Sequence, residues 1–505
     1  MLKSLINNVL KWNLQWRLDE IEFFKEFPEK IQRKVLKELV ENAKYTDYGV
    51  RHQFQKIGSY EDFRKNVPIV QYEDIEPYIA RAKRGEHNVL WPGEVNYFAK
   101  SSGTTNDRSK YIPVSIDALE ECHYKAGRDM LGIYFSLFPE SRLFHGLSLR
   151  IGGSTQFINE ANGSYSGDLS AILIKNFPAW VQWRSTPDQE IALISDWEEK
   201  IEKVIEITIK QDVTSMAGVP SWLYVMAQRI IQKTGVRHLH EIWPNMELYI
   251  HGGVSFVPYR HAFQKLFPGD RVHYLETYNA SEGFFGIQDL KEPGAILLML
   301  DYGIFYELIP VEKLDGAAEH IIPIWEAQTG VNYALVISTN AGLWRYMPGD
   351  TIIFSETKPL RFSISGRTKL YINAFGEELI IDNAERAIRK ACLETQAEVR
   401  DFTAGPHYFD GHGSGAHEWI IEFERKPRDF AAFCTILDEE LRRLNSDYDA
   451  KRYKDMTLKA PIVHQAPDQL FYNWLKSKNK LGGQNKVPKL KNDRVLLDEL
   501  LNLMK

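Results

Sequence analysis

The sequence has few cysteines, and this scarcity excludes several classes of site. Its three cysteines, Cys122, Cys392 and Cys434, are spread over 505 residues and form no CxxC pair. Each is expected to be a small buried apolar residue rather than a metal ligand or a nucleophile. Such cysteine usage suits a reducing compartment, so we expect a cytoplasmic protein.

The chain also has neither an excess of positive charge nor a long uninterrupted apolar run. A net charge of −6 argues against a nucleic-acid partner held by bulk electrostatics. The most apolar stretch, Ala295–Val311, is interrupted by Asp301 and Glu307, which predicts a buried β-hairpin rather than a membrane span. Met1–Phe24 has apolar residues at helical spacing between charges and is expected to form an amphipathic helix. No membrane insertion is predicted.

Between Tyr97 and about Gly366, apolar β-type runs alternate with helical stretches. The β-type runs are Leu143–Ile151, Met246–Ile250, Arg271–Leu275 and Ala334–Ser338, and the helical stretches are Ile116–Phe135, Glu190–Lys210, Pro220–Lys233 and Pro258–Phe267. This alternation predicts an α/β fold, a large N-terminal domain with helix-covered, mainly parallel β-sheets. Ligands of such sheets bind beyond the carboxyl ends of the strands.

The pattern changes around Phe362–Tyr371, and a chain of this length is expected to form at least two domains. A helix, a hairpin and a second helix are predicted, and together they form a small C-terminal α+β domain: Glu377–Cys392, then Glu398–Ala404 with Glu418–Glu424, then Arg428–Asn445. His407, His412 and His417 are expected in an exposed hairpin turn rather than in a metal site. The polar tail from Lys476 is expected to be mobile.

The segment from Ser101 to Lys110 reads SSGTTNDRSK and is rich in donors for phosphate oxygens. Hydroxyl groups, a glycine that permits close backbone approach, and the cations Arg108 and Lys110 all lie between two apolar runs. The alternative is a solvated Ser/Thr turn that binds nothing.

Two later motifs are suited to the rest of a nucleotide. In Tyr278–Gly283, Tyr278 is suited to stacking on a base and Glu282 to holding a divalent ion, although Ser and Glu also cap helices. In Trp344–Asp350, a carboxylate on a tight turn is suited to the ribose hydroxyls, although Pro-Gly-Asp alone is an ordinary turn.

Taken in order, these motifs resemble the adenylate-forming superfamily, and more closely its auxin-responsive acyl acid–amido synthetase branch. The SSGT[ST], YxxSE and YxxGD motifs of that branch fall on Ser101–Lys110, Tyr278–Glu282 and Tyr346–Asp350. The sequence His251-Gly252-Gly253 resembles the glycine pair beside the adenine. Ser365–Glu377 resembles the interdomain hinge, and Gly482–Lys489 resembles the segment whose lysine enters the site.

The resemblance implies ATP and Mg²⁺ as cofactors, and it assigns a role to each motif. ATP or AMP would contact Ser101, Ser102, Gly103, Thr104, Thr105, Gly252, Gly253, Tyr278, Ser281, Asp350 and Arg367. Lys486, Glu282 and Lys110 would be catalytic, with Glu282 also holding the metal. Residues 1–366 would form the large domain and 367–505 the small mobile domain, with a hinge near 366–371 and its pivot at Lys369.

The implied activity is ATP-dependent activation of a small carboxylic acid as acyl-AMP, followed by transfer to an amino-acid amine. An acyl-CoA synthetase that forms a thioester is the first alternative, and a non-catalytic nucleotide- or acyl-binding protein is the second. The acyl pocket is expected from Arg150–Gly153, Ala217–Trp222 and His251–Phe256, where Arg150 would pair with either a ligand carboxylate or a structural one.

Overall fold

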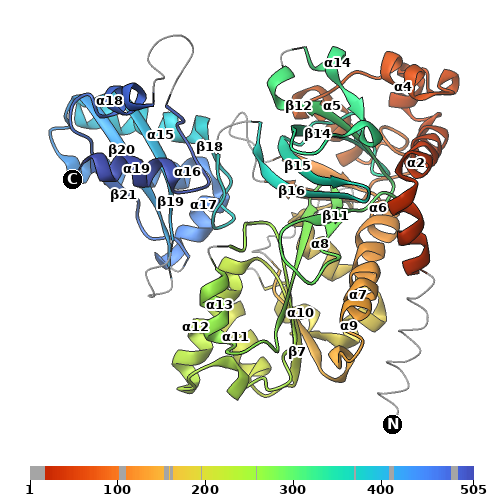
Figure 1. The fold of residues 1–505 in the computed structure, drawn as a ribbon, viewed down its shortest axis with the longest axis horizontal. Coiled ribbons are helices and arrows are strands. Elements are labelled where there is room, and N and C mark those ends of the chain that lie inside the picture. Colours follow the sequence, from red (N-terminus) through yellow and green to blue (C-terminus); the bar gives the residue numbers. More distant parts are fainter. Residues whose placement is uncertain are drawn as a thin grey trace.

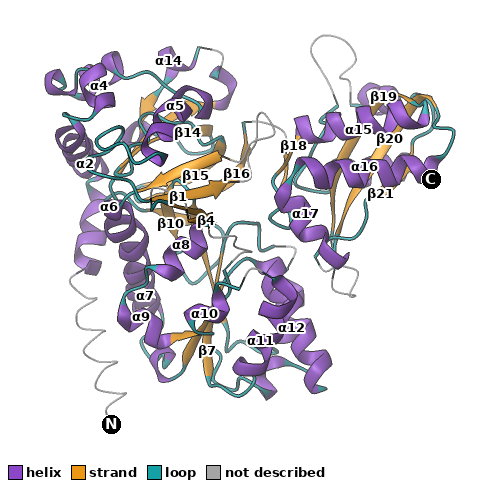
Figure 2. Ribbon diagram, turned by 180° about the vertical axis from the view of Figure 1, so that it is seen from behind, coloured by secondary structure: helices purple, strands orange, loops and turns teal. Residues whose placement is uncertain are grey.

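A computed structural model describes residues 17–101, 110–152, 158–159, 163–194, 196–257, 259–314, 316–368, 371–408, 414–455, 457–478 and 487–504. The C-terminal elements, blue in Figure 1, form a lobe that stands beside the larger body made by the rest of the chain. Figure 2 shows the same division from behind, with helices covering the strands of each lobe. No helix within the described ranges is long and apolar enough to cross a bilayer.

Helices from the N-terminal segment pack on the large domain. They are α2 (Pro28–Ala43), α3 (Asp47–Arg51), α4 (Tyr60–Asn66) and α5 (Tyr72–Lys83), and residues 17–26 are also helical. On α2 the buried side chains recur every three or four residues, as in Val35, Leu36 and Leu39. Gln32 on the same face is fully buried but satisfied, since its amide donates to the carbonyls of Leu300 and Ile304.

The main sheet has 12 strands in the order β13-β12-β14-β15-β16-β11-β10-β9-β8-β7-β3-β6. Its parallel half contains β6 (Ser185–Thr186), β3 (Leu147–Arg150), β7 (Val213–Ala217), β8 (Leu248–His251) and β9 (His273–Ala280). Its antiparallel half contains β10 (Gly283–Ile287), β11 (Ile296–Leu298), β16 (Leu360–Arg367), β15 (Asp350–Thr357), β14 (Asn332–Thr339), β12 (Ile304–Pro310) and β13 (Ile322–Pro323).

Helices cover both faces of the parallel half, as the alternation predicts. Figure 1 shows α11 (Trp197–Thr208), α12 (Pro220–Thr234) and α13 (Arg260–Leu266) on one side of β7. It shows α7 (Lys125–Leu137) and α9 (Ala179–Arg184) on the other side, and α8 (Leu169–Lys175) lies above them in the view. The short segments α6 (Ile116–Ala118), α10 (Gln189–Ala192) and α14 (Ala317–His320) complete the large domain.

The expected hairpin within Ala295–Val311 is wrong. Both of its strands are buried, but β11 pairs with β10 and β16, whereas β12 pairs with β13 and β14. The physical reason is Asp301, which bonds to Arg17 at 2.8 Å and Lys125 at 3.2 Å instead of sitting in an exposed turn. These contacts hold the connection against the N-terminal helices, so the two strands diverge.

A separate sheet of order β2-β1-β5-β4 contains both ends of Ser101–Lys110, the predicted phosphate-binding segment, here called the phosphate-loop segment. It contains β1 (Tyr97–Ser101), β2 (Lys110–Val114), β4 (Ile158–Asn159) and β5 (Tyr165–Gly167). Because β1 and β2 are antiparallel with Ser101 opposite Lys110, the two ends of the SSGTTNDRSK segment lie side by side.

The small domain contains the predicted helix, hairpin and helix. Its elements are β17 (Tyr371–Ile372), β18 (Leu379–Ile380), α15 (Ile381–Thr395), β19 (Glu398–His407), β20 (Ala416–Arg425), α16 (Phe430–Leu444), α17 (Ser446–Arg452), β21 (Ile462–Gln465), α18 (Leu470–Ser477) and α19 (Val495–Leu503). The predicted exposure of His417 is wrong: its ring is fully buried at 2.8 Å from the Glu377 carboxylate. His407 is half-buried and lies 3.2 Å from Glu418, and His412 falls outside the described residues.

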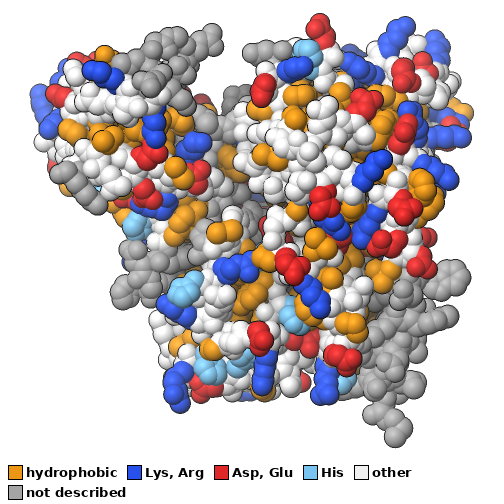
Figure 3. All heavy atoms as spheres, viewed as in Figure 1, with side chains coloured by type: hydrophobic (Ala, Val, Ile, Leu, Met, Phe, Trp, Pro, Cys, Tyr) orange, Lys and Arg blue, Asp and Glu red, His pale blue; other side chains and the backbone are white. Residues whose placement is uncertain are grey.

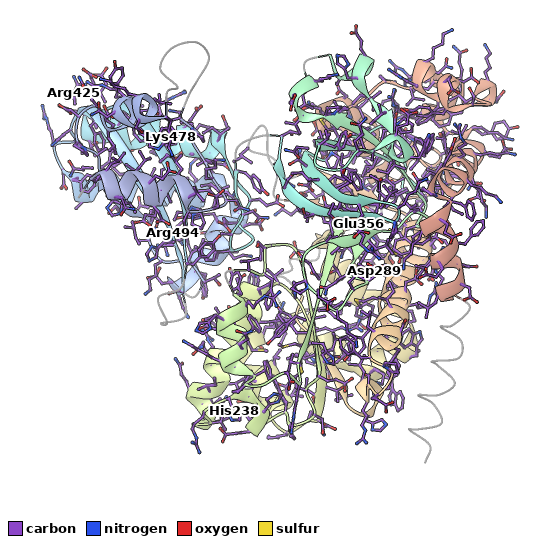
Figure 4. The ribbon with its side chains drawn as sticks, in the orientation of Figure 1. His238, Asp289, Glu356, Arg425, Lys478 and Arg494 are labelled. Atoms are coloured by element: carbon purple, nitrogen blue, oxygen red, sulfur yellow. The ribbon has the colours of Figure 1, made fainter. Side chains whose placement is uncertain are left out.

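The tail is more ordered than the sequence predicts. Leu496, Leu497 and Leu500 of α19 are buried in a cluster of their own with Ile420 of β20. Arg494 and Lys478, both labelled in Figure 4, tie α19 to its neighbours. Arg494 donates to Glu418 at 2.6 Å and Lys478 to Glu499 at 2.9 Å. The periodic leucines near the C-terminus were therefore a packing signal within an otherwise polar tail.

Candidate active site

The parallel strands end at one edge of the main sheet. Arg150 of β3 is opposite Ala217 of β7, Ala217 is opposite Ile250 of β8, and His251 is opposite Glu276 of β9. The loops that follow these strands therefore start close together, in the position where ligands of parallel sheets bind.

The phosphate-loop segment enters this region from the separate sheet. Ser101 lines a cavity at the edge, and Lys110 lies with its ammonium 5.5 Å from the ring centroid of Tyr72. Ser102, Gly103, Thr104 and Thr105 lie outside the described residues. Only the two ends of this segment are therefore described, and Lys110 lies close enough to Glu282 for its charge to affect that carboxyl.

Tyr278, Asp350 and Arg367 make direct contact although they come from three different strands. The Tyr278 hydroxyl donates to one carboxylate oxygen of Asp350, and Arg367 Nε donates to the other at 2.6 Å. Asp350 and Arg367 are paired across β15 and β16. Burial, and then the Asp350 charge, raise the pKa of the Tyr278 phenol well above its ordinary value. The structure thus brings together two motifs that are 72 residues apart in the chain.

Glu282 lies in the tight turn between β9 and β10, half-buried beside the same cluster. Burial, and then the charge of Asp350, raise the pKa of its carboxyl to about 7, against the opposing effects of Lys110 and Arg367. A cation bound here would relieve both the burial and the repulsion, because it stabilises the ionised carboxylate.

The glycine pair follows β8 and comes very close to β9. A side chain at Gly252 would place its Cβ 2.4 Å from the carbonyl oxygen of Thr277, a contact that no Cβ tolerates. Gly253 has a φ of +80°, which side chains rarely adopt. The conformation and close packing of the backbone thus require glycine at both positions. Gly252, Gly253 and Ser281 all line one cavity.

A cavity of about 580 Å³ opens from this edge, within the range of small-molecule sites. It includes parts of all three segments expected to form an acyl pocket: Arg150–Gly152, Ala217–Val219 with Trp222, and His251–Gly253. Apolar side chains of α7, α8, α9 and the α8–α9 connection complete the wall, among them Leu131, Leu173, Trp180 and, in the connection, Phe177. These were not foreseen, because helical leucines and aromatics are indistinguishable from core residues in a sequence.

Charged residues from both domains also face the cavity and were missed. Asp168, which precedes α8, has its pKa raised to about 6 by burial and then by Asp447. Lys451 of α17 is buried with its ammonium 3.9 Å from the Trp222 ring, and burial lowers its pKa. No motif signals these residues: Asp168 precedes α8 of the large domain, and Lys451 reaches the cavity from α17 of the small domain.

The remaining predicted residues cannot be placed. Lys369 and Lys486 lie outside the described residues, whereas their neighbours Thr368 and Val487 lie within them. The Lys489 ammonium pairs with the Asp401 carboxylate. The Lys489 carbonyl accepts a hydrogen bond from the backbone amide of Ala404 on β19 at 2.8 Å.

The donor set fits an ATP site with a phosphate-bridging cation better than a self-contained metal centre. Among the described residues, no group of three or more His, Cys, Asp or Glu side chains is arranged to hold a metal. One carboxylate, Glu282, beside the ends of a phosphate loop matches the way Mg²⁺ binds, with few protein ligands and several phosphate oxygens.

Comparison with known proteins agrees with this geometry. The GH3 family N-terminal domain matches residues 17–272, the GH3 family central domain matches 297–367, and the GH3 family C-terminal domain matches 382–495. The 4-substituted benzoates–glutamate ligase GH3.12 of Arabidopsis thaliana is 22% identical over 91% of this chain and 92% of its own. The jasmonoyl–L-amino acid synthetase JAR4 of Nicotiana attenuata is 23% identical over 87% of both chains.

Solved structures confirm the fold class. The AtGH3.15 acyl acid amido synthetase in complex with 2,4-DB superposes with a TM-score of 0.64 at 17% identity, over 97% of this chain and 96% of that one. A 2-hydroxyisobutyryl-CoA ligase in complex with 2-HIB-AMP and CoA gives 0.58 at 12% identity, over 95% and 94%. Since the family's N-terminal domain matches half of the chain and its other two domains follow in order, the chain belongs to the GH3 family and is an adenylate-forming acyl acid amido synthetase, as its motifs predict.

Proposed function

We propose that this protein uses Mg²⁺–ATP to activate a small carboxylic acid and transfers the acyl group to an amino-acid amine. The observation that carries the proposal is the contact of Tyr278, Asp350 and Arg367, with the Glu282 carboxyl close enough to Asp350, Arg367 and Lys110 to be affected by their charges. Ser101 and Ser281, next to these groups in the chain, line a cavity with more apolar than polar surface. The relatives GH3.12 and JAR4 are named for joining benzoates to glutamate and jasmonate to amino acids, which supports this choice of reactants.

In the proposed site, Ser101–Lys110 holds the β- and γ-phosphates, and Gly252, Gly253 and Tyr278 frame the adenine. Asp350 and Arg367 bind the ribose. The Asp350 carboxylate keeps a defined orientation because it accepts hydrogen bonds from Tyr278 and Arg367. Glu282 holds Mg²⁺, which neutralises phosphate charge. Ser281 faces the reacting centre from the same turn.

In the first step a carboxylate oxygen of the acid attacks the α-phosphorus, and the bond from that phosphorus to pyrophosphate breaks. In the second step the amine attacks the acyl carbon, AMP leaves with the electron pair of its C–O bond, and the amine loses a proton. Lys110 and Lys486 stabilise the charge that develops on the phosphate oxygens in the first step. Positioning and charge neutralisation supply most of the catalysis in such reactions.

We place the domain boundary at 366/367, with Lys369 as the pivot of a rotation between the two steps. The small-domain residues that line the cavity lie in 373–378 and 447–451, and none of the described residues from Val487 onward lines it. A rotation of the small domain between the two steps is the gating expected of two-step enzymes. We also propose a cytoplasmic location, given free cysteines at all three positions.

The acceptor separates this proposal from the acyl-CoA synthetase alternative. Purified protein is incubated with ATP, a panel of carboxylic acids and either CoA or mixed amino acids, and the products are weighed by mass spectrometry. We expect an amide to accumulate with amino acids and only background thioester with CoA. A thioester as the main product would contradict the proposal, and ATP binding without any product would support the non-catalytic alternative.

A further inference from the structure

Arg150 is a half-buried cation that has no counter-ion among the residues that the structure describes. It is the last residue of β3 and lines the cavity, where burial lowers the pKa of its guanidinium to about 10. Its contacts are a long 3.5 Å hydrogen bond to the Ser148 hydroxyl and stacking on Phe177, with the guanidinium 4.9 Å from the ring centroid. Among the described residues, no carboxylate lies within ion-pair distance of it.

Three other arginines with little-exposed side chains are paired with carboxylates, whereas the half-buried Arg184 on the same cavity donates to the Leu143 carbonyl at 3.0 Å. Arg345 bonds to Glu307 at 2.9 Å, Arg452 to Asp438 at 2.6 Å, and Arg17 to Asp129 at 2.8 Å. Removing a guanidinium from water is costly unless an anion compensates it. An unpaired arginine on a cavity wall is therefore best explained by an anion that arrives with a ligand.

The position of Arg150 indicates which ligand group it meets. Neighbouring strands are separated by about 4.8 Å, and β7 lies between β3 and β8, so Arg150 is roughly 10 Å along the sheet edge from the strand that precedes Gly252. The proposed phosphates lie still further away, beyond β9 at Glu282. On the proposed function, the carboxylate that reacts with ATP is thus placed nearer to β9 and β10 than to Arg150 on β3.

We propose that the acid substrate carries a second carboxylate, and that Arg150 binds it at the far end of the acyl cavity. The wall of the same cavity includes the apolar and aromatic side chains of Leu173, Phe177 and Trp222, which fits an apolar or aromatic spacer. A guanidinium binds a carboxylate through two parallel hydrogen bonds, which gives orientation as well as affinity. This inference rests on the proposed function, because that function locates the reacting end.

The carboxylate of the acceptor amino acid has the same chemistry. The acyl acid is favoured because the two contacts of Arg150, Ser148 and Phe177, both belong to the large domain. The small domain, which must move to admit an acceptor, borders the cavity instead at Asp447 and Lys451.

Binding without ATP tests the assignment directly. Isothermal titration compares biphenyl-4,4′-dicarboxylate with biphenyl-4-carboxylate, and terephthalate with benzoate, on the wild-type protein and on Arg150→Met, Arg150→Lys and Arg128→Gln. Wild type should bind at least one diacid about 10- to 100-fold more tightly than its monoacid. Arg150→Met should remove that preference and leave the monoacid unchanged, Arg150→Lys should retain part of it, and Arg128→Gln, an exposed cation beside the same cavity, should retain all of it.

Two further readouts separate the ways in which the inference can fail. Arg150→Met should melt at the same or a higher temperature than wild type, because it removes an uncompensated buried charge, and in the amide assay it should raise KM for the diacid but not for the amino acid. Equal binding of diacids and monoacids, or a raised KM for the amino acid alone, would overturn the inference. A diacid preference without any adenylation would sink the proposed function and leave the Arg150 assignment standing.

Discussion

Glu282→Ala is expected to lower ATP–pyrophosphate exchange by at least about 100-fold, and Asp350→Ala by a similar factor. Glu282 lies close enough to Lys110, Asp350 and Arg367 for the charges of all three to affect its carboxyl. Without it the cation loses its protein ligand. Without Asp350, Arg367 and the Tyr278 hydroxyl both lose the acceptor that orients them.

The control for this prediction is Glu292→Ala, which removes an exposed carboxylate ten positions away in the chain. It should exchange at the wild-type rate. Circular dichroism should show that all three variants are folded. Normal exchange in both Glu282→Ala and Asp350→Ala would mean that the nucleotide site lies elsewhere.

Glu307→Ala is expected to be the most destabilising single change, costing about 3–5 kcal/mol and lowering the melting temperature by on the order of 10 °C. Glu307 and Arg345 form a buried ion pair with side chains only 1% and 3% exposed, and Tyr60 also donates to Glu307 at 3.0 Å. Removing the carboxylate leaves the Arg345 guanidinium charged and buried. Arg345 opens the turn that ends at Asp350, so nucleotide binding should weaken as well.

A matched surface change isolates the effect of burial. Glu38 and Lys34 form an exposed pair on α2, at 58% and 70% side-chain exposure, so Glu38→Ala should shift the melting temperature by less than about 2 °C. In the double variant Glu307→Leu/Arg345→Met, stability should recover in part, because no buried charge is left alone. Equal melting temperatures for Glu307→Ala and Glu38→Ala would show that the buried pair does not hold this turn.

The sequence predicts the local features of this site better than its long-range contacts. Gly252 and Gly253 were recognisable by their resemblance to the family's glycine pair, and the structure adds that the backbone requires glycine there. Ser101 and Lys110 were recognisable because they end a dense run of phosphate donors. On the face of Figure 3, basic and acidic side chains alternate over both lobes, in keeping with the small net charge.

What the sequence could not predict depends on pairings between distant segments. The antiparallel half of the main sheet joins β11 to β16, and short strands carry no signal that identifies such a partner. Asp168 and Lys451 meet at the cavity only because the two domains touch. The sequence does not predict the aromatic wall at Phe177 or the pairing of Arg345 with Glu307 for the same reason. A sequence pattern can predict that a residue is buried, but it does not predict which residue packs against it.

The most direct test of the central claim is ATP–pyrophosphate exchange by the wild-type protein over a broad panel of mono- and dicarboxylic acids. We predict exchange that depends on Mg²⁺ and on one group of acids within the panel, and that disappears in Glu282→Ala. Absence of exchange with every acid, from a folded protein that binds ATP, would contradict the assignment of this site to acyl adenylation.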